Sequence, residues 1–124
     1  MSTVLGIDVG GSGIKGAPVD LEAGDFAEPR LRIVTPNPSS PKNVAAVISE
    51  IVANYADTIG DGPVGISLPA PIRHGVVAFM ANLDQKWTGL NAEEYLSDKL
   101  GRPVTVLNDA DAAGVAEVHF GAAS

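Results

Sequence analysis

A glycine-rich run near the N-terminus carries residue types suited to binding phosphate. Residues 8–16 read DVGGSGIKG and follow a short apolar, β-branched segment that predicts a buried strand. Glycines let backbone N–H groups converge on an anion, and a serine hydroxyl and a lysine ammonium add donors around the same oxygens. We therefore predict a phosphate-binding hairpin turn. The residues expected to contact the phosphate are Gly10, Gly11, Ser12, Gly13 and Lys15.

Asp8 stands at the end of the predicted strand, directly before this turn. Its carboxylate suits a magnesium ion that bridges phosphate oxygens, bound directly or through water. The alternative is a tight structural hairpin in which Ser12 and Lys15 only face solvent, because glycine-rich turns are common. The run taken alone supports both interpretations.

Two better-known nucleotide loops are excluded by their context. Residues 11–16 match the dinucleotide pattern G-x-G-x-x-G, but that pattern needs a helix to begin at its third glycine. Pro18 argues against a helix there, since it removes a hydrogen bond and clashes with the preceding turn. A Walker loop fails because Lys15 is followed by Gly16 and not by serine or threonine.

A second polar cluster stands where a predicted strand passes into a predicted helix, in residues 107–114, LNDADAAG. Polar groups at the carboxyl end of a core strand lie where open α/β sheets bind ligands. Asn108 can hydrogen-bond to sugar hydroxyls, and Asp109 can take the proton of a hydroxyl that attacks a phosphoryl group. Either residue could serve only as a helix cap, although capping is compatible with catalysis. Asp111 is expected to favour the positive end of the helix dipole.

The elements that must position these clusters alternate strands with helices. Residues 44–55 carry one apolar stripe at helical spacing behind a Ser40-Pro41 start, and Asn91 with Glu94 forms a capping pair. The predicted order is βββαβαβα, an α/β fold that opens with three antiparallel strands. The expected strands are 4–9, 14–21, 30–35, 64–68 and 104–107, the helices 41–59, 91–100 and 108–120, and a small hairpin lies around Gly75 in 72–80.

Together the two clusters resemble motifs of the ROK family of sugar kinases, repressors and related proteins. Residues 8–16 resemble its first phosphate loop and residues 108–113 its catalytic segment, and the spacing between them fits. Residues 15–20, 73–77 and 82–87 narrow the likeness to polyphosphate glucokinases of the actinobacterial kind. The resemblance covers essentially the whole chain. It implies an actin-like ATPase (ribonuclease H-like) domain with a mixed central sheet flanked by helices.

The resemblance also implies roles for individual residues. Asp109 would be the general base toward the 6-hydroxyl of glucose, and Asn108 would hold neighbouring hydroxyls. The donor would be polyphosphate or ATP with magnesium, and Lys15 would contact its phosphate. Trp87 would line the pocket or belong to the core. Further candidates for the sugar pocket are Asn82, Pro69 and Ala70.

Composition bounds the partners and the compartment. The net charge of −7 argues against binding to nucleic acid, whose partners carry basic faces, but it is compatible with a polyanion in a small local site. With two histidines and no cysteine we expect no zinc site. No secretion leader and no apolar run of membrane-spanning length is visible, so we expect a cytoplasmic protein without a membrane partner.

The 124 residues are enough for one domain with a sizeable core. Kinases of the family have a second domain that supplies most nucleotide contacts. We therefore expect residues 1–124 to be the N-terminal domain only, with the C-terminal domain absent and little or no activity alone. Family members are often homodimers, with contacts mostly in that other half. A noncatalytic sugar-binding or regulatory module is the alternative function.

Overall fold

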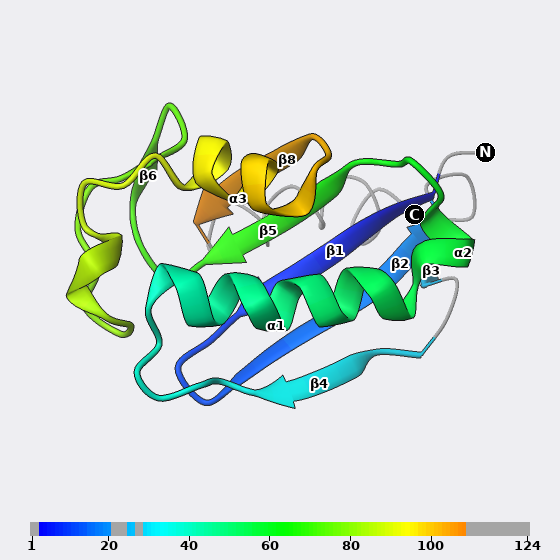
Figure 1. Ribbon diagram of the computed structural model, residues 1–124, viewed down its shortest axis with the longest axis horizontal. Coiled ribbons are helices and arrows are strands. Elements are labelled where there is room, and N and C mark those ends of the chain that lie inside the picture. Colours follow the sequence, from blue (N-terminus) through cyan, green and yellow to red (C-terminus); the bar gives the residue numbers. More distant parts are fainter. Residues whose placement is uncertain (1–2, 21–24, 27–28, 109–124) are drawn as a thin grey trace.

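The computed structural model describes residues 3–20, 25–26 and 29–108. Strands dominate the first third of the chain, and helices alternate with strands after it (Figure 1). In chain order the elements are β1 (Thr3–Val9), β2 (Gly13–Asp20), β3 (Asp25–Phe26), β4 (Leu31–Val34), α1 (Pro41–Asn54), α2 (Ala56–Ile59), β5 (Val64–Leu68), β6 (Ile72–Arg73), β7 (Val76–Val77), the 3-10 helix η1 (Gln85–Trp87), α3 (Ala92–Leu100) and β8 (Val104–Asn108).

The central sheet is mixed, as predicted for this α/β fold. Its order is β3-β2-β1-β5-β8, and β4 pairs with β2 beside β3. The pairing of β1 with β2 is antiparallel, whereas β1 with β5 and β5 with β8 run parallel. The carboxyl ends of β1, β5 and β8 therefore meet at one edge of the sheet, and the segment containing β6 lies beside that edge (Figure 1).

The two faces of the sheet differ in chemistry. Helices α1 and α3 lie on the same face, where they cover alternate side chains of the strands (Figure 1). In β1 the buried residues are Leu5, Ile7 and Val9, and Asp8 between them is exposed. This alternation follows from the period of two along a strand, and it places the predicted metal ligand on the face opposite α1.

Gly16 explains how closely α1 approaches the sheet. A Cβ atom there would lie 2.6 Å from Cγ2 of Ile51 in α1 and 3.2 Å from Cγ1 of Ile7. The third glycine of the dinucleotide-like pattern therefore lies within β2 and under α1, where it serves packing. Its position agrees with the exclusion of a dinucleotide loop.

The variant Gly16→Ala should lower the free energy of unfolding by about 1–3 kcal/mol, the cost of forcing an extra methyl group into a packed core. Urea denaturation measures this directly. Gly11→Ala is the control, since its Cβ would meet only the carbonyl of Asn82 at 3.7 Å, an ordinary contact. Equal stability of Gly16→Ala and the wild type would show that α1 does not pack as described.

Two expectations about the helices need correction. The predicted single helix over 41–59 is wrong at Tyr55, whose φ of −111° and ψ of 13° divide α1 from α2. The buried Tyr55 hydroxyl donates a hydrogen bond to the carbonyl of Pro29, so a tertiary contact accompanies the break. Asn108 was expected to begin the last helix but is the final residue of β8, and the rest of that helix, 109–120, lies outside the described residues.

The capping prediction for α3 is confirmed. The side chain of Asn91 accepts a hydrogen bond from the backbone N–H of Glu94 at 3.0 Å, and Gly101 ends the helix in the left-handed region with a φ of 66°. No helix in residues 3–20, 25–26 and 29–108 combines the length and apolar character needed to cross a membrane.

Candidate active site

The glycine-rich turn between β1 and β2 leaves backbone donors available. Gly10 N–H donates to the carbonyl of Gly13 at 2.9 Å, which closes the turn. Thr35 fixes the turn from outside: its hydroxyl donates to the carbonyl of Gly10 at 2.7 Å and its N–H to that of Ser12 at 3.3 Å. Within the described part of the chain, the N–H groups of Gly11 and Ser12 have no acceptor. Both residues are exposed, so these donors are open to an anion.

A glycine is needed at position 13 because Arg32 lies close to it, and not because the backbone there has a positive φ. Among the described glycines, positive φ angles occur at 60, 75, 89 and 101 and not in the turn. A Cβ at Gly13 would lie 2.6 Å from the guanidinium atoms of Arg32. One guanidinium nitrogen, Nη2, donates to the carbonyl of Ser12 at 3.2 Å. Arg32 therefore lies against the turn from β4.

Strand register places four polar side chains in one row across the sheet. Asp8 of β1 lies between Ser67 of β5 and Lys15 of β2, and Lys15 in turn pairs with Arg32 of β4. The hydroxyl of Ser67, itself only 8% exposed, donates to Oδ1 of Asp8 at 2.8 Å. That hydrogen bond fixes the carboxylate at the carboxyl end of β1.

This arrangement fits a magnesium ion shared with a phosphorylated substrate. Magnesium is commonly bound by one or two carboxylates together with substrate phosphates and water. The Asp8 carboxylate is exposed and lies at the carboxyl end of β1, before the turn that carries the open N–H groups of Gly11 and Ser12, so it has the chemistry that a magnesium ligand needs. Elsewhere among the described residues, no three His, Cys, Asp or Glu side chains gather to bind a metal ion.

The described part of the second predicted cluster, Leu107 and Asn108, lies at the same edge of the sheet. Asn108 ends β8 and pairs with Leu68, the last residue of β5. Pro69 and Ala70 follow β5 directly, Pro69 half-buried and Ala70 buried. One strand, β5, therefore lies between Asn108 and Asp8. Asp109, the predicted base, and Asp111 lie outside the described residues.

Asn82 is brought to the phosphate turn by a loop that is held in place at two points. Its side chain is exposed, and its carbonyl oxygen lies 3.7 Å from the position that a Cβ on Gly11 would take. The indole N–H of Trp87 donates to the carbonyl of Ser39 at 2.8 Å, and the N–H of Asp84 donates to the Ser39 hydroxyl at 3.1 Å. Trp87 is fully buried and so belongs to the core, one of the two positions expected for it.

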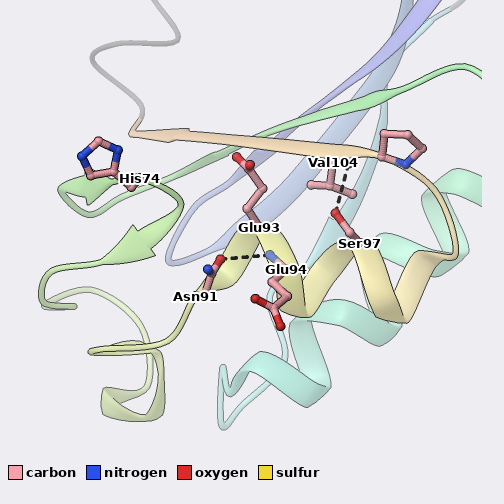
Figure 2. A pocket seen from close by; sticks show the side chains of 7 residues that line it. His74, Asn91, Glu93, Glu94, Ser97 and Val104 are labelled. Atoms are coloured by element: carbon pink, nitrogen blue, oxygen red, sulfur yellow. Dashed lines mark hydrogen bonds between the residues drawn. The ribbon is translucent and has the colours of Figure 1, made fainter.

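An open pocket of about 400 Å³ lies elsewhere, along the outer edge of β8 (Figure 2). Its polar side chains bind the strand itself: Ser97 accepts from the N–H of Val104, and Glu93 accepts from that of Val106, both at 3.2 Å. These contacts occupy backbone N–H groups of β8, the outermost strand, and so protect it from pairing with another strand. His74 also lines this pocket, but none of the predicted site residues that the structure describes does.

Three contacts of the site were missed from the sequence. Thr35 and Arg32 hold the turn, and Ser67 holds Asp8. Alternation in residues 30–35 could have placed Arg32 on the face opposite Leu31 and Ile33. Its position beside Lys15 depends on a strand register that alternation does not specify.

Comparison with known proteins agrees with this geometry. The model of the ROK family matches residues 4–124. The polyphosphate glucokinase of Mycobacterium tuberculosis is 48% identical over 119 residues, which cover 95% of this chain and 44% of that protein.

Two solved structures share the fold. The inorganic polyphosphate/ATP-glucomannokinase of Arthrobacter sp. strain KM is 42% identical with a TM-score of 0.93, over 100% of this chain and 51% of that one. A ROK family glucokinase of Streptomyces griseus, solved with glucose and AMPPNP, is 29% identical with a TM-score of 0.84, over 98% of this chain and 38% of that one. The chain thus spans about half or less of the length of these relatives.

Proposed function

This chain belongs to the ROK family, and from that premise we propose that it is the first domain of a glucokinase. The reaction is transfer of a phosphoryl group from polyphosphate or ATP to the 6-hydroxyl of glucose or a related hexose. The observation that supports it most is that Asp8 and Asn108 lie at the same edge of the sheet. Asp8 with the glycine turn lies at the end of β1, and Asn108 lies at the end of β8, on either side of β5.

The donor is bound on the β1 side. The N–H groups of Gly11 and Ser12 and the ammonium of Lys15 donate hydrogen bonds to its phosphate oxygens, and Gly10 and Gly13 shape the turn. Asp8 would hold magnesium, directly or through water, and the ion would supply positive charge against the phosphates of the donor. Because Thr35 and Arg32 hold the turn and Ser67 holds Asp8 before substrate arrives, little reorganisation accompanies binding.

The acceptor is bound between the carboxyl ends of β5 and β8 and the loop that carries Asn82. Asn108 and Asn82 hydrogen-bond to sugar hydroxyls, and Pro69 with Ala70 borders the ring. Asp109 takes the proton of the 6-hydroxyl while the hydroxyl oxygen forms a bond to the terminal phosphorus of the donor. The bond from that phosphorus to the bridging oxygen breaks, and the donor leaves one phosphate shorter. Positioning the two substrates accounts for much of the rate.

A second domain completes the site. Closure of two domains would exclude water from the reacting phosphate, so residues 1–124 alone should bind substrates weakly and turn over slowly or not at all. The domain assignment, the cytoplasmic location and the choice between the two donors form part of the proposal.

A coupled assay of glucose 6-phosphate formation tests the function. It compares this chain with a two-domain protein that contains it, each supplied with glucose, magnesium and either polyphosphate or ATP. We expect turnover by the two-domain protein with at least one donor, and little by the chain alone. Sugar binding without phosphorylation by the two-domain protein would instead support the noncatalytic, regulatory alternative.

A further inference from the structure

Two cations lie side by side next to the phosphate turn. Lys15 of β2 and Arg32 of β4 are direct partners in the antiparallel register. Like charges directly opposite one another destabilise a sheet. Within the described part of the chain neither residue forms an ion pair, although Asp8 pairs with Lys15 in register on β1. This row therefore carries excess positive charge in a chain whose net charge is −7.

The Arg32 guanidinium is held in position against the turn. Its Nη2 donates to the carbonyl of Ser12 at 3.2 Å, and the group lies so close to Gly13 that a Cβ there would be 2.6 Å away. A guanidinium has five N–H donors in a planar fork, which suits phosphate oxygens. With one of its donors used by Ser12, others remain for an anion beside the open N–H groups of Gly11 and Ser12.

The order of the strands indicates in which direction a bound phosphoryl donor extends from Asp8. Neighbouring strands are about 4.8 Å apart, so Arg32 lies roughly 10 Å from Asp8 across the sheet. Three of the four described acceptor residues lie on the other side of Asp8: Asn108 ends β8, and Pro69 and Ala70 follow β5. A donor whose terminal phosphate is at Asp8 therefore extends toward Arg32. A condensed phosphate chain still presents charged groups at that distance, whereas a nucleotide presents its sugar and base.

We propose that Arg32, together with Lys15, binds the phosphate groups that follow the transferred one in a polyphosphate donor. Arg32 is thus a specificity residue for polyphosphate over ATP. The inference rests on the proposed function, because the direction of the donor is set by phosphoryl transfer at Asp8.

The test measures binding of long-chain polyphosphate and of ATP to this chain by calorimetry at low salt, and KM for each donor in the two-domain protein. The variants are Arg32→Gln, Arg32→Lys and the control Arg30→Gln, which removes the same charge from an exposed position two residues earlier. Arg32→Gln should weaken polyphosphate binding about fivefold, the loss of one exposed charge-assisted contact, and ATP binding less than about twofold. Arg32→Lys should retain most of the affinity.

A further readout separates a phosphate contact from a structural role. If Arg32 neutralises phosphate, Arg32→Gln should make the dependence of polyphosphate affinity on salt concentration shallower, because one cation fewer displaces counterions. Equal losses for polyphosphate and ATP would overturn the proposal, since Arg32 would then act only by holding the turn at Ser12. A loss no greater than that of Arg30→Gln, or no polyphosphate binding by the wild-type chain, would also overturn it. Glucose phosphorylation by the wild-type two-domain protein judges the proposed function separately.

Discussion

Asp109→Asn should lower kcat about a thousandfold in a two-domain protein that contains this chain, within the range expected for loss of a general base. The amide keeps the size of the side chain and its capacity to cap a helix, but it does not take a proton. Binding of glucose should therefore change little. Steady-state kinetics with saturating donor gives kcat, and calorimetry gives the affinity for the sugar.

Asp111→Asn is the matched control. It removes a carboxylate two residues after Asp109, and Asp111 is expected only to favour the helix dipole. It should retain near-normal turnover. Near-normal turnover of Asp109→Asn with intact glucose binding would remove Asp109 from the role of base. Equal losses in both variants would indicate that the effect comes from the stability of the segment.

Asp8→Asn is expected to have the second-largest effect, lowering kcat about a hundredfold, as for loss of an electrostatic group at a transferring phosphate. An asparagine oxygen can still accept the hydrogen bond that Ser67 donates at 2.8 Å, so the end of β1 should keep its geometry. The negative charge that attracts magnesium is lost. The magnesium concentration needed for half-maximal rate should therefore rise.

Asp61→Asn provides the control, since Asp61 is an exposed residue in the turn between α2 and β5, away from the carboxyl ends of β1, β5 and β8. Its rate and its magnesium dependence should match those of the wild type. If Asp8→Asn keeps both of these properties, the magnesium assignment is wrong and the hydrogen bond from Ser67 serves only the structure.

The sheet was largely predictable because its strands carry strong local signals. The apolar run before Asp8 and the run over 64–68 agree with β1 and β5 within one residue, and the caps at Asn91 and Gly101 define α3. Parallel order also follows from alternating strands and helices. For that reason Asp8 and Asn108 could be expected at one edge before their positions were known.

What the sequence did not reveal depends on contacts between distant segments. The division of the predicted helix at Tyr55 coincides with a hydrogen bond to Pro29, 26 residues earlier. The position of Arg32 beside Lys15 depends on the β2–β4 register, and that of Asn82 beside Gly11 depends on a loop fixed through Trp87. Local propensity and periodicity carry no information about such pairings.

Phosphorus NMR of the reaction product tests the central claim most directly. The two-domain protein is incubated with glucose, magnesium and each donor in turn, and the product is identified by the coupling of its phosphorus to sugar protons. We expect one new phosphate ester coupled to the two protons on C6 of glucose, formed with at least one donor. A phosphate on another hydroxyl, or bound glucose that stays unmodified with both donors, would contradict it.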